Sequence, residues 1–429
     1  MAKRFQAPKG TRDLLPPDTA LWARVEESAR RVFGLYGYRE IRTPIFEETE
    51  LFARGVGEST DIVGKEMYTF TDKGERSLTL RPESTAAVCR AYVEHGMQSL
   101  PQPVRLFYIG PQFRYERPQK GRFRQFHQIG AELLGGRGAE SDSEILLMLV
   151  RFLRELGFSD LKVLINTVGD AESRLAYREA LRDHLLPMKE SLSEDSRRRL
   201  ETNPLRILDT KGAEEQALLA FAPRLEGSLT PAAAAHFERV LAAMDAFGLA
   251  YSVEPKLVRG LDYYTNTVFE IVSEGLGAQN AICGGGAYEG LVEELGGPPT
   301  YGVGFAIGED RLLEVLPAGS PARRAGAGPV LVTFAGKAAR EGEAGSALVR
   351  VMEELRAAGI PCQEASGRGG KLFELAESLG TPAVVFLGED ELEAGTLSVR
   401  TLSNREQRTL PRGEAIAALQ AFYGTEKQP

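Results

Sequence analysis

Polar side chains recur at alternate positions of residues 112–132, the part of the chain with residue types best suited to chemistry. We predict two β-strands there, 104–116 and 122–134, joined by a loop. Because side chains alternate between the two faces of a strand, one face would carry Gln112, Arg114, Glu116, Arg124, Phe126, Gln128, Gly130 and Glu132. Such a face would make a poor core, since each polar group would need a hydrogen-bond partner. It suits the floor of a polar pocket, where arginine binds phosphate oxygens and phenylalanine offers a stacking surface; an exposed hairpin with ordinary charges is the alternative.

The loop of this hairpin is strongly basic. Residues 114–124, RYERPQKGRFR, hold five cations and one acid, a net charge of +4, whereas the whole chain carries −8. A local positive charge on an acidic protein indicates contact with a polyanion such as a nucleic acid. A solvated hairpin remains the alternative.

The stretch RGLDYYTNTVFE (259–270) places an arginine, a glycine, an aspartate and two tyrosines before a strand-like run. Neighbouring side chains on an extended backbone point to opposite faces. We therefore expect one of Tyr263 and Tyr264 to pack inward and the other to present its hydroxyl group to a ligand.

Two glycine-rich runs, GGG (284–286) and GVGFAIG (302–308), are open to several interpretations. The second is only a variant of a dinucleotide-binding pattern, and no acidic residue follows on a clear strand. Glycines that allow close strand packing are one alternative. Glycines that let a flat base lie against the sheet are another. No phosphate-binding pattern of the type GxxxxGK[ST] occurs in the sequence.

Length and composition limit the class of protein. At 429 residues the chain is expected to form two or three domains. No run approaches the about 20 apolar residues of a membrane span, and the N-terminal segment has no apolar region typical of a secretory signal. The three cysteines, Cys89, Cys283 and Cys362, are far apart and form no CxxC pair. These features favour a cytoplasmic protein without a disulfide framework, membrane anchor or structural metal site.

Secondary-structure patterns indicate how these segments are positioned. Helices are predicted at 21–36, 85–96 (capped by Ser84 or Thr85), 140–156 and 309–316, and strands at 77–81, 161–168, 267–273, 278–284 and 301–307. Residues 171–250 are rich in helix formers and form a predicted helical insertion. After a linker at 317–328, residues 329–429 alternate between strand and helix patterns and predict an α/β domain that ends in a hairpin.

Taken together, these segments resemble the class II aminoacyl-tRNA synthetases and, within them, the histidyl-tRNA synthetases. FRYERPQKGRFRQFHQIGAE (113–132) resembles motif 2, YGVGFAIGEDRL (301–312) resembles motif 3, and residues 40–44 resemble motif 1. LRPEST (80–85), RGLDYYTNTVFE and GGGAYEGL (284–291) resemble the histidine-specific signatures. The resemblance implies an α+β fold. An antiparallel sheet with a helical insertion forms the catalytic domain (1–325), and an anticodon-binding-type α/β domain (329–429) follows.

The resemblance also implies the reaction. L-Histidine would be activated by ATP, with magnesium expected alongside, and then transferred to the 3′ end of tRNA(His). Arg114, Arg259 and Arg311 would stabilise the phosphates during catalysis. Histidine would be bound by Glu83, Ser84, Thr85, Arg114, Gln128, Glu132, Arg259, Tyr263, Tyr264 and Tyr288. ATP would be bound by Arg114, Glu116, Phe126 and Arg311, and tRNA by Arg117, Gln119 and Arg122. The motif 1 resemblance implies a homodimer.

Some positions depart from the family pattern. Ala287 and Asn266 stand where arginine is usual, Glu289 replaces an aspartate, and Ser84 replaces a common glycine. The main alternative function is that of a histidine-sensing regulatory paralogue of ATP phosphoribosyltransferase. That group usually lacks the final domain and the ATP-binding arginines. A class II ligase for another amino acid is a further alternative.

Overall fold

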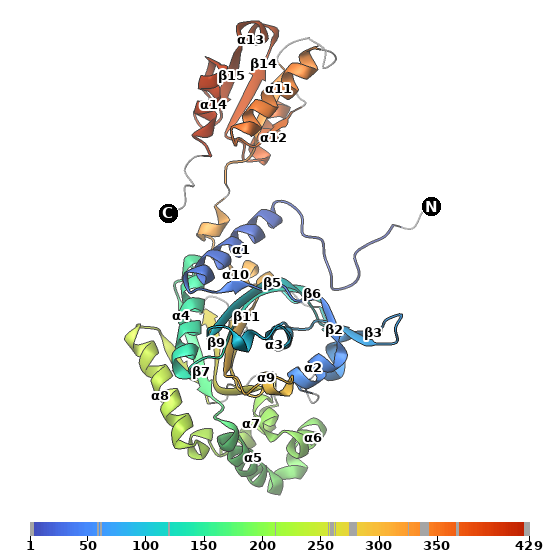
Figure 1. Cartoon of the computed structure of the whole chain (residues 1–429), viewed down its shortest axis with the longest axis vertical. Coiled ribbons are helices and arrows are strands. Elements are labelled where there is room, and N and C mark those ends of the chain that lie inside the picture. Colours follow the sequence, from blue (N-terminus) through green and yellow to red (C-terminus); the bar gives the residue numbers. More distant parts are fainter. Residues whose placement is uncertain are drawn as a thin grey trace. The chain divides into compact units, whose positions relative to one another are not determined.

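The polar hairpin is part of an eight-stranded, largely antiparallel sheet in the computed structural model of the chain (Figure 1). The structure describes residues 4–57, 60, 62–118, 121–210, 212–255, 257, 261, 263–273, 281–324, 326–334, 343–365 and 369–423. Two units are present, Met1–Ala322 and Arg323–Pro429.

The strands of this sheet follow the order β1-β5-β6-β11-β10-β9-β7-β8. Their bounds are β1 Arg39–Glu40, β5 Val104–Phe113, β6 Gln125–Leu134, β7 Leu161–Thr167, β8 Tyr251–Val253, β9 Tyr264–Ser273, β10 Ala281–Tyr288 and β11 Gly302–Gly308. Within the described part of this sheet, only the β1–β5 and β7–β8 pairs are parallel. β10 extends through the triple glycine and past the end predicted at residue 284. Glycine runs usually indicate turns, but here they lie under large side chains of neighbouring strands.

Helices cover both faces of the sheet (Figure 1). One face packs against α1 Asp18–Leu35, α4 Ala139–Glu155 and α10 Glu309–Val315. Phe33 of α1 anchors this core, since its ring lies 5.4–5.8 Å from the rings of Phe107, Phe152 and Phe305. The other face packs against α3 Thr85–Glu94 and α9 Leu291–Glu294. Residues 129, 131 and 133 of β6 contact the first core, so the even-numbered positions face α3.

A small sheet lies beside this second face. It has the order β2-β4-β3, with β2 Phe46–Glu48, β4 Ser77–Leu80 and β3 Tyr68–Thr71. Helix α2, Thr49–Val56, follows β2 directly and packs on α3 through Phe52 and Ala86. β4 leads within four residues into the N-terminus of α3, which brings residues 81–85 to the large sheet.

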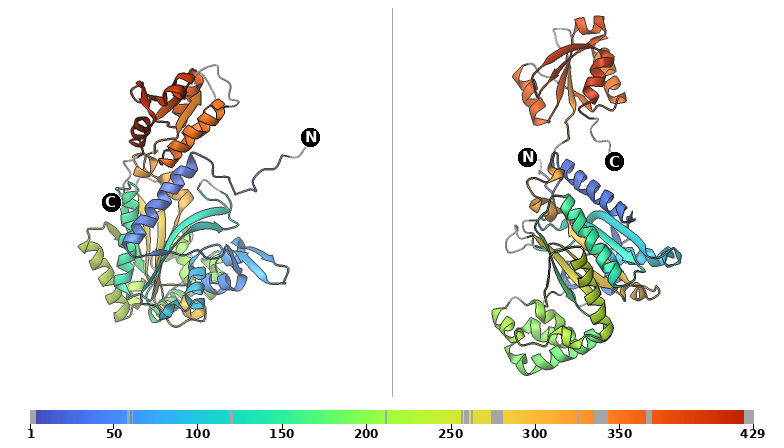
Figure 2. Two further views of the ribbon diagram at one scale, coloured as in Figure 1. Left: turned by 45° about the horizontal axis from the view of Figure 1, so that its top comes forward. Right: turned by 90° about the vertical axis from the view of Figure 1, so that its left-hand side faces the viewer.

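The predicted insertion consists of α-helices and short 3-10 helices (Figure 2). It contains α5 Ala171–Leu185, α6 Glu194–Thr202, α7 Ala213–Leu219 and α8 Pro231–Ala246. Six buried residues form a separate small core: Leu181, Leu185, Leu192, Leu200, Ile207 and Leu219. α8 leaves this group and packs against the main core through Val240 and Met244.

The second unit is an α/β domain with the strand order β13-β12-β14-β15-β16. Its elements are β12 Val330–Phe334, α11 Glu343–Ala357, β13 Cys362–Glu364, α12 Gly370–Ser378, β14 Ala383–Leu387, α13 Glu389–Ala394, β15 Thr396–Thr401, β16 Gln407–Pro411 and α14 Arg412–Gln420. Helix α14 follows the predicted hairpin and was not expected from the sequence. Among the described residues, none of the helices combines the length and apolar character that crossing a bilayer requires.

Candidate active site

A cavity of about 150 Å³ opens between the even-numbered face of β6 and the N-terminus of α3. Eight residues predicted from the sequence line it together: Glu83, Thr85, Arg114, Gln128, Glu132, Tyr263, Tyr264 and Tyr288. They come from five separate segments of the chain. The sheet therefore brings eight of the ten predicted histidine-binding residues together in one polar pocket.

Glu83 forms the N-terminal cap of α3. Its carboxylate accepts hydrogen bonds from the backbone N–H groups of Thr85 (2.6 Å) and Ala86 (3.0 Å). This corrects the predicted cap, because the side chain of Ser84 makes no capping bond. Ser84 does not line the cavity; its hydroxyl is buried and accepts a hydrogen bond from Gln112 Nε2 at 2.7 Å. Burial raises the pKa of Glu83, and the hydrogen bonds from Ala86 and Thr85 partly oppose this shift, followed by the charge of Arg114.

Glu132 lies at the centre of a buried hydrogen-bond network. Only 1% of the residue is exposed. Thr85 Oγ1 donates to Glu132 Oε1 and Tyr288 OH donates to Oε2, each at 2.7 Å. Burial raises the pKa of Glu132 to about 8, against the effect of these two hydroxyl donors. The network fixes the direction of the carboxylate and leaves a buried acceptor for a ligand that brings N–H groups.

Tyr263 and Tyr264 lie on the same side of the backbone, contrary to the predicted alternation. Their ring centroids are 4.7 Å apart, and both rings line the cavity. The alternation fails because Tyr263 precedes β9, which begins at Tyr264. Tyr263 also meets the ring of Tyr288 edge to face at 5.6 Å. The two tyrosines therefore form one aromatic wall.

Arg114 lies at the mouth of the cavity, just after β5. Its Nε donates to the carbonyl of Pro82 at 2.8 Å, and its guanidinium carbon lies 5.3 Å from the centre of the Phe126 ring. Glu116 lies near two cations, with its oxygens 3.8 Å from Arg114 Nη1 and 3.6 Å from Arg122 Nη1. Gln128 is buried in the wall, and its Oε1 has no hydrogen-bond partner within the described residues. This oxygen is available to accept from a bound ammonium group.

Arg311 belongs to the first turn of α10, directly after β11. It lies near the same end of the sheet as Arg114, because Gly308 of β11 pairs with Gln128 and β6 carries Phe126 two residues away. The neighbouring Asp310 accepts from the backbone N–H of His127 at 2.8 Å and from Arg12 Nη2 at 2.7 Å. These bonds fix the start of α10 against β6 and the N-terminal segment.

Arg259 and Gln119 lie outside the described residues, so their predicted roles rest on the sequence alone. Arg117 and Arg122 are described and are exposed beyond the end of β5. Tyr108 and Leu261 line the cavity but were not predicted. Tyr108 could have been found from the hairpin register, because it lies opposite Gly130, and a glycine within a strand indicates a large neighbour.

Two departures from the family pattern contact each other. Asn266 Nδ2 donates to Glu289 Oε1 at 3.1 Å. Asn266 has φ of +48°, a left-handed conformation that asparagine tolerates better than most residues. Ala287, the third departure, is fully buried opposite Thr265. Asn266 and Glu289, which both depart from the family pattern, are therefore hydrogen-bond partners in this chain.

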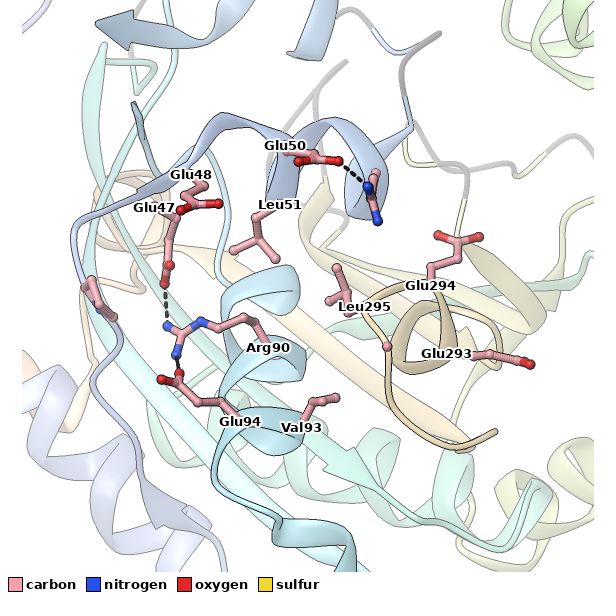
Figure 3. A pocket seen from close by; sticks show the side chains of 13 residues that line it. Glu47, Glu48, Glu50, Leu51, Arg90, Val93, Glu94, Glu293, Glu294 and Leu295 are labelled. Carbon is pink, nitrogen blue, oxygen red and sulfur yellow. Dashed lines mark hydrogen bonds and ion pairs between the residues drawn. The ribbon is translucent and has the colours of Figure 1, made fainter. Parts of the chain in front are cut away.

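A larger cavity, of about 760 Å³, lies among α2, α3 and α9, and none of the predicted site residues that the structure describes lines it (Figure 3). Six glutamates and two arginines line it: Glu47, Glu48, Glu50, Glu94, Glu293, Glu294, Arg54 and Arg90. Arg90 bonds to Glu47 and Glu94, and Arg54 bonds to Glu50 (Figure 3). Because carboxylates predominate, this cavity is unsuited to a triphosphate.

We expect replacement of Glu309 by leucine to stabilise the protein increasingly as the pH rises. Glu309 begins α10, is fully buried, and has no hydrogen-bond partner for either oxygen in the described structure. Burial raises its pKa to about 9. The folded form holds this proton while the unfolded chain releases it, so wild-type stability falls as pH rises between the two pKa values. The gain on substitution should be roughly 3 kcal/mol larger near pH 8 than near pH 5.5.

Chemical denaturation at both pH values measures this gain. Glu314→Leu, at an exposed position of the same helix, is the matched control and should show no such pH dependence. An equal effect of Glu309→Leu at both pH values would show that Glu309 does not stay protonated in the folded protein.

Known proteins resemble this chain over nearly its whole length. A family model described as histidyl-tRNA synthetase matches residues 10–312, and an anticodon binding domain model matches 330–422. A histidine–tRNA ligase of Synechococcus elongatus is 49% identical over 414 residues, covering 96% of this chain and 94% of that protein. One from Koribacter versatilis is 48% identical over 432 residues, covering 98% and 96%.

Solved structures show the same relationship. The apo histidyl-tRNA synthetase of S. aureus superposes with a TM-score of 0.80 at 36% identity, covering 97% of this chain and 100% of that one. An ATP phosphoribosyltransferase regulatory subunit/histidyl-tRNA synthetase from Bacillus halodurans gives a TM-score of 0.65 at 23% identity, covering 90% and 99%. At that identity the similarity concerns the fold alone.

Proposed function

The chain belongs to the histidyl-tRNA synthetase family, and from this premise we propose that it ligates L-histidine to tRNA(His) with the residues of the cavity described above. In the first step the histidine carboxylate attacks the α-phosphorus of ATP, which gives histidyl-adenylate and pyrophosphate. In the second step a ribose hydroxyl at the tRNA 3′ end displaces AMP. The attacking carboxylate is already ionised, so the first step needs no general base.

The observation that carries the proposal is the buried Glu132 beside four tyrosines in a cavity of about 150 Å³. An imidazole ring carries two nitrogens that must both be paired when it is buried. Glu132 and Tyr264 are proposed to bind one nitrogen each. An amino acid that lacks either nitrogen would leave a buried polar group unpaired, and this cost provides selectivity.

The backbone end of histidine is proposed to lie toward α3 and Arg114. Glu83 and the unpartnered Oε1 of Gln128 provide acceptors for the ammonium group. Arg114, held by Pro82 and Phe126, provides donors for the carboxylate and the α-phosphate. The reacting carboxylate would thereby be directed at the phosphorus.

Catalysis is proposed to rest on fixed cations, because negative charge develops on the phosphate oxygens during transfer. Arg114 and Arg259 would bind the α-phosphate from two sides, and Arg311 would bind the γ-phosphate. Phe126 would stack on adenine. Magnesium is expected to accompany ATP, since it prefers phosphate oxygens together with one or two carboxylates, and Glu116 is the proposed carboxylate.

The remaining assignments are part of the proposal. The match of the second unit to an anticodon-binding family supports a tRNA partner, although residues 329–429 carry 11 basic and 14 acidic side chains. The motif 1 resemblance of residues 40–44 supports a homodimer. A cytoplasmic location follows from the use of charged tRNA in translation.

Charge reversal at Arg117 is expected to impair transfer to tRNA and to spare activation of histidine. Arg117 is an exposed residue of the basic loop, and it does not belong to the residues that line the histidine cavity. Losing a phosphate contact and adding a repulsive charge should lower kcat/KM for tRNA by about tenfold or more in the Arg117→Glu variant.

Aminoacylation and ATP–pyrophosphate exchange should be measured on the same preparations. Arg151→Glu, at an exposed position of α4 on the opposite side of the sheet, is the control. Equal losses in both assays would remove Arg117 from the proposed tRNA surface.

Attachment of labelled L-histidine to tRNA(His), dependent on ATP, tests the proposed function as a whole. The histidine-sensing alternative predicts binding of histidine without charging of tRNA. Arg114, Arg311 and the second unit are all present, which favours the ligase.

A further inference from the structure

Glycines lie directly under the side chains that line the histidine cavity. A Cβ atom at Gly130 would approach Cε2 of Tyr108 to 2.7 Å, and one at Gly286 would approach Cδ1 of Tyr264 to 2.8 Å. A Cβ at Gly302 would approach Cζ of Tyr288 to 2.6 Å, and one at Gly304 would approach Cδ of Glu132 to 2.6 Å. Real Cβ atoms do not come so close to other atoms. Each of these wall side chains therefore occupies space that any side chain at the glycine position would need.

Gly304 has the most direct effect on ligand recognition, because its partner is the carboxylate at the centre of the network. It pairs with Glu132 across the β6–β11 register. The carboxylate lies over this glycine while it accepts from Thr85 and Tyr288 at 2.7 Å. A methyl group at residue 304 would push the carboxylate away from both hydroxyls.

We propose that Gly304 is a positioning residue for amino-acid selection: it leaves the space on β11 in which the Glu132 carboxylate lies, and it acts on the imidazole through that carboxylate. This inference rests on the proposed function. It also gives a role to the glycine-rich run 302–308, which the sequence left open between close strand packing and a base-binding surface.

The test compares two glycine-to-alanine variants on the same strand. At Gly304 the new methyl group collides with Glu132, whereas at Gly308 the nearest atom, Cβ of Arg311, is 3.9 Å away and φ is −72°, which alanine adopts readily. Gly304→Ala should raise KM for histidine by about tenfold, and KM for ATP should stay within about twofold. Gly308→Ala should change neither constant. Equal rises in both KM values for Gly304→Ala, or no rise at all, would overturn the proposal.

A stability measurement tests the same contact without any activity. An alanine at residue 304 would also approach the carbonyl oxygen of Ala131 to 2.8 Å, so some loss of stability could come from the backbone. The unfolding temperature should therefore be compared for wild type, Gly304→Ala, Glu132→Ala and the double variant. Most of the loss caused by Gly304→Ala should disappear when Glu132 is absent. An undiminished loss would assign the glycine to backbone packing and overturn the proposal.

The two experiments separate failure of the inference from failure of the proposed function. If the wild type shows no histidine-dependent exchange, the proposed function fails, and the stability cycle still decides whether Gly304 makes room for Glu132. If the wild type exchanges label normally, the two KM values decide whether this space governs histidine binding.

Discussion

Replacing Arg114 with alanine is expected to slow histidine-dependent ATP–pyrophosphate exchange by roughly 10²–10³-fold. The guanidinium is held in place by Pro82 and Phe126 and lines the cavity. Its charge is therefore available, without reorganisation, to the phosphate oxygens on which charge develops. The loss should appear mainly in kcat, because the interaction strengthens as the transition state forms.

The arginine side chain should not be replaceable by another cation here. Arg114→Lys keeps the charge but lacks the planar pair of donors, so it should recover only a small part of the rate. Arg154→Ala, at an exposed position of α4, is the surface control and should retain wild-type exchange. Full activity of Arg114→Ala would show that this guanidinium does not act on the phosphate.

Replacing Glu132 with alanine is expected to raise KM for histidine on the order of a hundredfold. A buried hydrogen bond to the imidazole would be lost, and the hydroxyls of Thr85 and Tyr288 would lose their acceptor. KM for ATP should change little, because Glu132 lies deep in the amino-acid cavity. Steady-state exchange kinetics with each substrate varied in turn measure both constants.

The Glu132→Gln variant separates the contribution of the carboxyl group from the contribution of side-chain size. It keeps the length of the side chain and one acceptor oxygen, so Glu132→Gln should bind histidine better than Glu132→Ala and less well than wild type. β-Thienylalanine, whose ring has no nitrogen, provides a second readout. It should inhibit Glu132→Ala more strongly than wild type, because the wild type leaves the buried carboxylate unpaired beside a ring without nitrogen and the alanine variant does not. Unchanged KM for histidine in Glu132→Ala would contradict the assigned role.

The polar face of the hairpin could be predicted because it depends only on the two-residue period of a strand. Gln128 and Glu132 follow that period along β6, and both line the cavity. The rule failed for Tyr263, which lies just before β9 rather than within it. A period gives the correct face only where the strand limits are known, and such limits depend on pairing with distant strands.

Other features depend on contacts that local patterns do not contain. Glu83 caps α3 because its carboxylate reaches two backbone N–H groups, although Ser84 is the residue type expected at a cap. Gly304 makes room for Glu132, which is 172 positions earlier in the chain and becomes its neighbour only when β6 pairs with β11. Tyr108 differs from these cases, because the register of the β5–β6 hairpin places it opposite Gly130 and could have indicated it. The resemblance to a known family indicated that these segments act together, whereas the contacts between them became visible only in the folded structure.

Exchange of labelled pyrophosphate into ATP by the wild-type chain is the decisive measurement of histidine activation. Label should enter ATP only when L-histidine is present, and Arg259→Ala should lower the rate by roughly 10²–10³-fold. A chain that binds histidine and yet exchanges no label would contradict the ligase function and favour a histidine sensor.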